Sequence, residues 1–310
     1  MRIAPIRMAM TRSFFLAFAA LAVMAVPASA QAPTDYSKVE IKTTKLTNNF
    51  YTLEGAGGMI GVFTGPDGVL MVDAQYPQLT DKLVAAIKQV SSGPIRFLVN
   101  THVHADHTSG DVNFAKLGVV IFAREELRDR LAHPAPQANG APGVPAPPGG
   151  LPVVTYTGRV RWHMNGDDVE LIPIPRAHTD GDTLVRFPGQ DVIMSGDFYR
   201  SVGYPNIDRA NGGSLNGMLA GLGELAGMAG PNTKIVPGHG PMVDRTAVVA
   251  HRDMILAIRD RIAKLIDQGK TQDEVIAAKP TADFDAKISQ PGTSAERFVG
   301  QVYAELKATK

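Results

Sequence analysis

The chain has 310 residues, and its 31 basic residues nearly balance its 30 acidic ones. This near-neutral balance gives no basic field of the kind that attracts nucleic acid, so we expect no nucleic-acid partner. Cysteine is absent, which excludes disulfides and thiol nucleophiles. Any metal must therefore be bound by His, Asp or Glu.

Residues 1–30 have the pattern of an export signal. Several arginines precede an apolar stretch from Phe14 to Val26. Ala28-Ser29-Ala30 then offers the small residues that a signal peptidase reads. The stretch is short for a membrane span, which needs about 20 residues, and an uncleaved anchor is the alternative. We expect a mature protein that begins at Gln31, without a stable membrane anchor, and is periplasmic or secreted.

The mature chain alternates short apolar runs with longer amphipathic segments. The first two runs flank Gly65-Pro66-Asp67-Gly68, a turn that predicts a β-hairpin ending at Asp73. Further strands are predicted at residues 95–100, 119–123, 168–174, 183–187, 191–194 and 234–237. Helical spacing of apolar residues predicts helices at 79–90, 125–131, 215–228, 245–268 and 294–306, with another beginning at Thr271. The alternation indicates an α/β layered fold.

Residues 134–152 are rich in proline, glycine and alanine and cannot form a regular element. Because strands continue on both sides, we interpret this segment as a loop at the rim of a site, and a domain boundary is the alternative. We expect one domain over residues 31–269 and a C-terminal helical extension, residues 270–310, that packs on it.

The run from Thr101 to His107 is the strongest chemical signal in the chain. His102 and His104 are two residues apart at the end of a predicted strand, so their side chains should point to the same side. Asp106 and His107 follow on the turn, which gives two ligand pairs for two neighbouring metals. Histidine with carboxylate suits zinc, and iron accepts the same ligands. The alternative is a solvated loop that happens to be rich in histidine.

Three more candidate ligands follow predicted strands: His178, Asp197 in a Gly-Asp pair, and His239 in Gly-His-Gly. Each of them alone could be a structural loop residue. In this order, however, the motifs H-x-H-x-D-H, His, G-D and G-H-G resemble the metallo-β-lactamase superfamily, and the resemblance extends from about residue 50 to 241.

The resemblance implies a four-layer αβ/βα sandwich with two metals at one edge, between two sheets. It also implies a metal-dependent hydrolase that holds two zinc ions and attacks a small-molecule substrate with a metal-bridging hydroxide. The ligands that it implies are His102, His104 and His178 for the first metal, Asp106, His107 and His239 for the second, and Asp197 as a bridge. Asp106 would also steer the proton of the nucleophile.

The bridging position narrows the substrate. Zinc β-lactamases proper usually have Cys or Ser there, whereas Asp is common in thioesterases, lactonases and phosphodiesterases of the superfamily. A narrower similarity points to exported bacterial metallo-hydrolases, some of them β-lactamase-like. We therefore expect cleavage of a cyclic amide, lactone or ester, with a β-lactam as one candidate. A thioesterase, a phosphodiesterase and an iron-dependent redox enzyme of the same fold are the alternatives.

Residues around the ligands have secondary predicted roles. Asp73, Thr101 and Asp180 are interpreted as hydrogen-bond partners that orient ligating imidazoles, with simple turn roles as the alternative. Substrate contacts are predicted for Tyr199, Arg200 and Asn211. Arg200 could bind a substrate carboxylate, but we interpret it first as a solvated surface arginine.

Overall fold

The computed structural model describes residues 34–136, 140–289 and 291–308, together with Met1. Apart from Met1, the expected export signal lies outside these residues. The chain divides into a unit of residues 1–35 and a compact unit of residues 36–310, and the second unit contains everything described below. Among the described residues, we find no helix with the length and apolar character needed to cross a bilayer.

The first sheet has seven strands in chain order. They are β1 (Lys42–Lys45), β2 (Phe50–Glu54), β3 (Ile60–Phe63), β4 (Val69–Val72), β5 (Ile95–Val99), β6 (Val120–Arg124) and β7 (Val154–Tyr156). Strands β1 to β4 are antiparallel and β4 to β7 are parallel. The predicted hairpin is β3–β4. Its turn requires Gly68, because φ is 101° and an added Cβ would lie 2.8 Å from the carbonyl oxygen of Pro94.

The second sheet has five strands in the order β12-β11-β10-β9-β8. They are β8 (Val160–Met164), β9 (Asp167–Pro173), β10 (Thr183–Phe187), β11 (Val192–Met194) and β12 (Lys234–Val236). Only β11 and β12 are parallel neighbours. Since β9 and β11 are both antiparallel to β10, the carboxyl ends of β9, β11 and β12 lie at one edge of this sheet.

The predicted helices lie close to observed ones, and the structure adds three short helices that were not predicted, at residues 105–108, 111–116 and 282–285. The helices are α1 (Thr80–Val90), α2 (Ala105–Thr108), α3 (Asp111–Lys116), α4 (Glu125–Ala132), α5 (Leu215–Met228), α6 (Arg245–Asp267), α7 (Gln272–Ala277), α8 (Ala282–Asp285) and α9 (Ala295–Ala308). Short 3-10 turns are η1 (Tyr36–Lys38), η2 (Pro77–Leu79), η3 (Pro148–Gly150), η4 (Pro188–Gln190), η5 (Gly196–Phe198) and η6 (Arg209–Asn211). Side-chain caps explain two starts: Asp244 accepts from the amide of Ala247 at α6, and Thr271 forms a capping box with Glu274 at α7.

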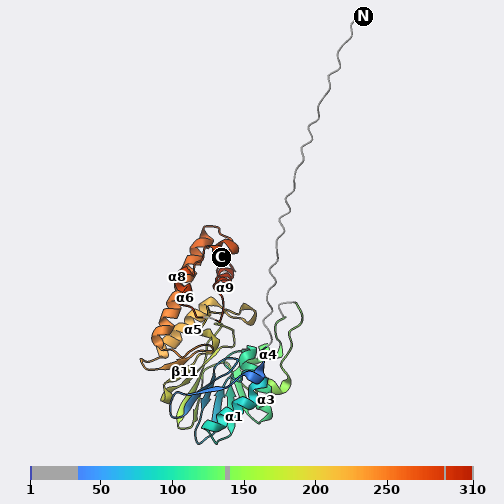
Figure 1. Cartoon of the computed structure of the whole chain (residues 1–310), viewed down its shortest axis with the longest axis vertical. Coiled ribbons are helices and arrows are strands. Elements are labelled where there is room, and N and C mark those ends of the chain that lie inside the picture. Colours follow the sequence, from blue (N-terminus) through green and yellow to red (C-terminus); the bar gives the residue numbers. More distant parts are fainter. Residues whose placement is uncertain (2–33, 137–139, 290, 309–310) are drawn as a thin grey trace. The chain divides into compact units, whose positions relative to one another are not determined.

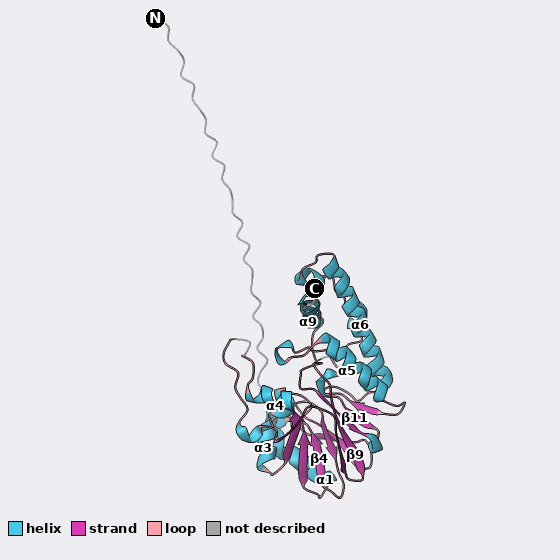
Figure 2. Ribbon diagram, turned by 180° about the vertical axis from the view of Figure 1, so that it is seen from behind, coloured by secondary structure: helices cyan, strands magenta, loops and turns pink. Residues whose placement is uncertain are grey.

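The predicted α/β four-layer sandwich is confirmed. Side chains such as Phe50, Phe63 and Phe187 fill the space between the two sheets. Helix α1 covers the outer face of the first sheet through Leu83 and Ile87. Helices α5, α6, α7 and α9 form a further apolar cluster with the second sheet. Figure 1 shows the orange and red C-terminal helices gathered beside α5, and Figure 2 shows the strands of both sheets with α1 and α3 near β4.

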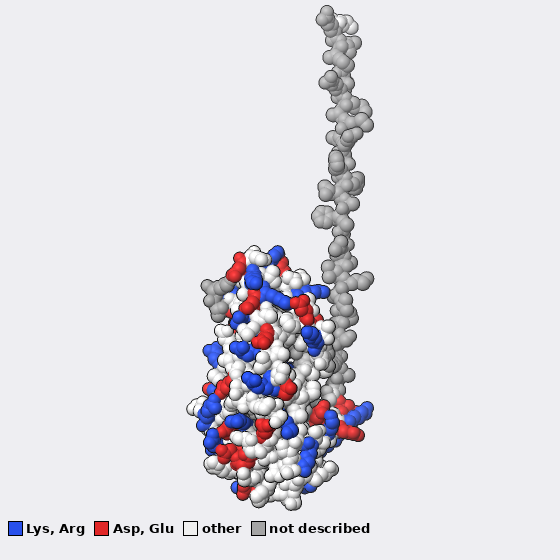
Figure 3. Space-filling view, turned by 90° about the vertical axis from the view of Figure 1, so that its left-hand side faces the viewer, with Lys and Arg blue, Asp and Glu red and all other residues white. Residues whose placement is uncertain are grey.

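The surface carries charges of both signs. The face in Figure 3 shows Lys and Arg interspersed with Asp and Glu over the whole folded unit, without a continuous field of one sign. The pattern agrees with the near-neutral composition and gives no electrostatic argument for a polyanionic partner on this face.

Candidate metal centre

The predicted ligands all lie just beyond the carboxyl ends of strands. His102 and His104 follow β5, and Asp106 and His107 lie on α2. His178, Asp197 and His239 follow β9, β11 and β12 respectively. The strand argument for His102 and His104 was wrong in detail, because β5 already ends at Val99. The loop after β5, and not the alternation of a strand, brings the two imidazoles together.

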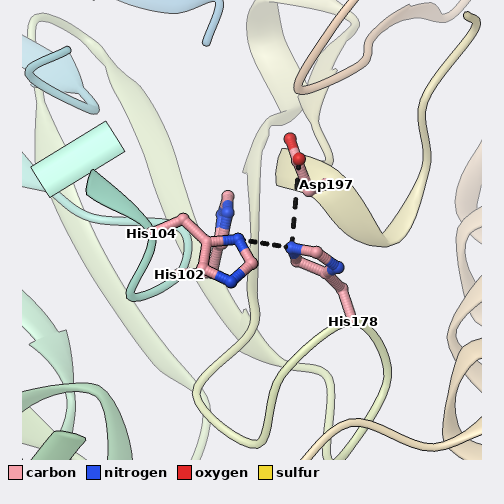
Figure 4. A group of neighbouring side chains, drawn as sticks. All are labelled: His102, His104, His178 and Asp197. Atoms are coloured by element: carbon pink, nitrogen blue, oxygen red, sulfur yellow. Dashed lines mark hydrogen bonds and ion pairs between the residues drawn. The ribbon is translucent and has the colours of Figure 1, made fainter. Parts of the chain in front are cut away.

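One group of side chains consists of His102, His104, His178 and Asp197, with ligand atoms within 4.8 Å of one another (Figure 4). His104 Nδ1 lies 2.9 Å from His178 Nε2, and His178 Nε2 lies 3.9 Å from Asp197 Oδ2. The His102 and His178 rings meet edge to face, with their centroids 4.8 Å apart. Three imidazoles and a carboxylate thus converge on one point.

A second group consists of Asp106, His107 and His239. His239 Nε2 lies 3.1 Å from Asp106 Oδ2 and 3.4 Å from His107 Nε2. The other oxygen of Asp197, Oδ1, is 3.3 Å from His107 Nε2 and 3.4 Å from His239 Nε2. Asp197 therefore presents one oxygen to each group, which is the placement that a bridging carboxylate requires.

The outer nitrogens of four imidazoles are held by acceptors. His107 Nδ1 lies 2.7 Å from Asp73 Oδ2, and His178 Nδ1 lies 2.6 Å from the carbonyl oxygen of Asn206. His104 Nε2 lies 2.7 Å from Asp208 Oδ2. His102 Nδ1 is 3.1 Å from Thr101 Oγ1, which itself donates to Asp73. A proton on each outer nitrogen leaves the inner nitrogen with a free lone pair, as a metal ligand needs.

Burial and neighbouring charges set the protonation of the site. Burial lowers the pKa of His178 to about 4 and that of His102 well below its ordinary value. Burial also opposes a charge on His107, but Asp73 and Asp197 outweigh it and raise the pKa of His107 well above 6.5. Against the effect of burial, the hydrogen bond from His239 lowers the pKa of Asp106 to about 2, so this carboxylate is ionised at neutral pH.

These residues fit a pair of metal ions. His102 Nε2 is buried and has no hydrogen-bond partner among the described residues, which is costly for a polar nitrogen unless something binds it. His102 belongs to the same group as His104 and His178, in which His104 Nδ1 and His178 Nε2 lie only 2.9 Å apart. The donors are imidazole nitrogens and carboxylate oxygens, a set that suits divalent zinc or iron.

The two carboxylates that follow His178 make different contacts, and that of Asp180 differs from the prediction. Asp180 does not reach an imidazole: its Oδ2 pairs with Arg130 Nη2 at 2.7 Å. Asp182 instead shapes the loop, because its Oδ2 accepts from the amide of His178 at 2.6 Å. Asp73 and Thr101 do lie against the imidazoles as predicted. Asp208, which holds His104, carried no motif and was missed.

The predicted substrate contacts separate into three cases. Tyr199 is only 3% exposed and packs edge to face on His251, so it belongs to the core and the prediction was wrong. The Arg200 side chain is not solvated on the surface: it is 16% exposed, and Nη1 lies 3.7 Å from Asp197 Oδ2. Asn211 donates to Asp208 and lines a cavity beside His104.

Comparisons with known proteins agree with the fold. A linear primary-alkylsulfatase from Pseudomonas sp. is 23% identical over 252 residues, which cover 68% of this chain and 48% of the relative. The chain thus spans about half the length of this curated relative. A stereoselective inverting sec-alkylsulfatase structure from Pseudomonas sp. aligns with a TM-score of 0.64 at 16% identity, covering 85% of this chain and 50% of that one. A metallo-beta-lactamase structure from Pontibacter korlensis aligns with a TM-score of 0.58 at 18% identity, covering 70% of this chain and 99% of that one.

The family follows from the central part of the chain. Residues 54–243 match the model of the metallo-beta-lactamase superfamily. This range includes every predicted ligand, from His102 to His239. The chain is therefore a member of the metallo-beta-lactamase superfamily.

Proposed function

We propose that this protein is an exported hydrolase that holds two zinc ions and cleaves a small ester or lactone. The observation that supports it best is the set of four imidazoles whose outer nitrogens are held by Thr101, Asp208, Asp73 and Asn206. His102, His104, His178 and Asp197 would hold one ion, and Asp106, His107 and His239 the other, with Asp197 shared. A pair of divalent ions supplies a nucleophile at neutral pH and neutralises charge that develops on the substrate.

The chain's own groups position the reactants. Asp106 is ionised at neutral pH, and its side chain is 26% exposed, so it can accept a hydrogen bond from the attacking water and orient it. Asp73 and Asp208 hold His107 and His104 by their outer nitrogens and so fix the direction of the inner ones. The ligand loops thereby offer a site whose geometry is set before a substrate arrives.

The bridging Asp197 favours an ester or lactone over a β-lactam within this proposal. Zinc β-lactamases proper usually have Cys or Ser at that position, as noted above. A β-lactam therefore serves as a test substrate rather than the expected one.

A sulfate ester is the second candidate substrate. It is favoured by the similarity to a linear primary-alkylsulfatase over 68% of this chain. Arg200 offers a fixed positive charge near the centre, with Nη1 3.7 Å from Asp197. A guanidinium can bind a sulfate as it binds a carboxylate or phosphate.

The test combines metal analysis with a hydrolysis screen of the zinc-loaded protein. The substrates are a lactone, a carboxylic ester, a primary alkyl sulfate, a thioester, a phosphodiester and a cephalosporin reporter. We expect about two zinc ions per chain and turnover of the ester or lactone. His102→Ala should lose both zinc and turnover, whereas His163→Ala should lose neither, because the side chain of His163 is 80% exposed and lies outside the site.

Two results would contradict the proposal. The first is stoichiometric iron in the purified protein with no hydrolysis, which would indicate the redox alternative. The second is full zinc retention by His102→Ala, which would show that the orphaned nitrogen is not a ligand. Turnover of the alkyl sulfate alone would select the second candidate substrate.

A further inference from the structure

A cavity of about 470 Å³ opens beside the first group of ligands. Its walls come from the segment around α2 and α3, the end of α4, the described part of the proline-rich loop, and η6. His104 and Asp208 belong both to this wall and to the candidate metal centre. The volume falls within the range of small-molecule sites, roughly 300–1,000 Å³. The cavity is therefore separated from the candidate metal centre only by the side chain of His104.

The accessible charged groups on this wall are already paired. Arg130 Nη2 is 2.7 Å from Asp180, and Asp208 Oδ2 is 2.7 Å from His104. Asp111 is the other carboxylate on the wall: its Oδ1 accepts from Asn100 at 3.1 Å, and its Oδ2 has no partner among the described residues but is buried in a side chain that is only 1% exposed. A charged ligand group would have to break one of these pairs, at the cost of leaving a charge without its partner. An apolar group would not.

The rest of the wall is mostly apolar and is preformed. Besides Thr108, Ser109 and Asn211, it contains Val112, Leu131, Val144, Ala146 and Pro147. The amide of Ala146 donates to the carbonyl oxygen of Leu131 at 2.9 Å, which ties the proline-rich loop to the end of α4. Prolines on this wall restrict the backbone, so the loop loses little conformational freedom when something binds. Val144 lines the edge of the cavity and is 78% exposed, so its apolar surface is open to a ligand.

We infer that this cavity binds an unbranched or lightly branched apolar chain of the substrate, while the bond to be cleaved lies at the metal centre. The inference rests on the proposed hydrolase function and adds the substrate class: esters with a hydrocarbon tail. His104 is the junction, because Nδ1 faces His178 and Nε2 faces Asp208 on the cavity wall. The tail is recognised by burial of its surface, which is non-directional and proportional to its length until the cavity is full.

The test is a chain-length series of p-nitrophenyl esters, from acetate through butyrate and hexanoate to octanoate, with zinc-loaded protein. The leaving group stays constant, so only the tail changes. We expect kcat/KM to rise by about fourfold for each methylene group that is buried, and then to level off. Val144→Lys should lower the octanoate-to-acetate ratio of kcat/KM by about tenfold or more, comparable to losing two buried methylene groups. Leu131→Gln, which replaces a wall side chain by a polar one of similar size, should lower the same ratio.

Val153→Lys is the matched control. Val153 is 71% exposed, so the two valine variants place the same charge at positions of similar exposure, but Val153 does not line the cavity. Its chain-length dependence should equal that of the unmodified protein. Thermal unfolding of all variants shows whether a loss reflects misfolding. Calorimetric titration with octanoate and acetate gives a readout without turnover: octanoate should bind more tightly, and Val144→Lys should remove that preference.

The outcomes separate this inference from the function on which it rests. Hydrolysis of all esters with equal kcat/KM, or equal losses in Val144→Lys and Val153→Lys, would overturn the cavity inference and leave the hydrolase intact. Failure to hydrolyse any ester would overturn the ester function. In that case the octanoate titration decides the cavity: a preference that Val144→Lys removes supports it, and none refutes it.

Discussion

Removing the carboxylate of Asp73 is the sharpest test of how the centre is held together. This side chain is 1% exposed and has three short contacts. Its Oδ1 accepts from the amide of Thr101 at 2.7 Å, and its Oδ2 accepts from Thr101 Oγ1 and faces His107 Nδ1, both at 2.7 Å. Asp73→Ala leaves a buried amide and a buried imidazole without their acceptor.

The expected loss can be estimated from these contacts. Breaking a buried charged pair costs about 3–5 kcal/mol, and an orphaned buried amide costs about 1–3 kcal/mol. Because the contributions overlap, we expect Asp73→Ala to lower the free energy of unfolding by about 4 kcal/mol. Asp73→Asn should lose less, because its amide oxygen still accepts one hydrogen bond and Asn tolerates the φ of 66° at this position. Zinc affinity should fall about 10–100-fold in Asp73→Ala, since His107 is no longer oriented.

Urea unfolding of the zinc-free protein and competition titration with a zinc chelator measure the two effects separately. Asp260→Ala is the control, because the side chain of Asp260 is 59% exposed and pairs only with its neighbour Arg259 in the described structure. The reasoning is refuted if Asp73→Ala unfolds within about 1 kcal/mol of the unmodified protein and keeps its zinc affinity.

Three further predictions follow from single contacts. Asp208→Asn should weaken zinc binding about tenfold in a chelator competition, because His104 Nε2 loses its charged acceptor; unchanged affinity would show that His104 needs no orientation. Burial lowers the pKa of His251 to about 4, so the folded protein keeps it neutral. The stability that this provides is complete above pH 6.5 and is lost as the pH falls toward 4, by at most about 1.4 kcal/mol per pH unit. Thermal unfolding against pH should therefore be less steep in His251→Leu, and equal slopes would contradict this assignment. Lys82 donates to the carbonyl oxygens of Tyr36, Ser37 and Val39, so Lys82→Met should speed amide exchange over residues 36–39 and cost about 1–2 kcal/mol, with hydrolysis unchanged. Slow exchange in this variant would mean that other contacts hold the segment.

The sequence predicted the elements whose side chains alternate or recur clearly. Helices α5 and α6 were predicted to within one residue, because their apolar positions recur at helical spacing. Strand β1 (Lys42–Lys45) was missed, because its four residues are all exposed and polar and show no apolar alternation. The strand is held by backbone pairing with β2, which composition does not reveal.

The candidate site shows the same difference: residues in short motifs could be predicted from the sequence, and contacts between distant residues could not. The ligands stand in short motifs, and the structure brings all of them together. Asp208 could not be found, because it lies 104 positions from His104 and meets it only when the two halves of the sandwich pack. Asp180 and Asp182 flank the same glycine, and only the path of the loop decides which one faces His178. Tyr199 was predicted as a substrate contact because it lies two residues after the candidate ligand Asp197. The sequence does not show that its side chain is buried.

The division of the ligands between two sheets has a consequence for the order of assembly. Each group takes two candidate ligands from the segment formed by α2 and the loop between β5 and α2, and the rest from loops of the second sheet. A chain in which only one half has folded thus offers at most two candidate ligands to each group. Tight metal uptake should therefore coincide with docking of the halves and not precede it. The rate at which the absorbance of a bound metal develops during refolding would then report the rate of docking. Metal that is added before docking would not stabilise either half on its own.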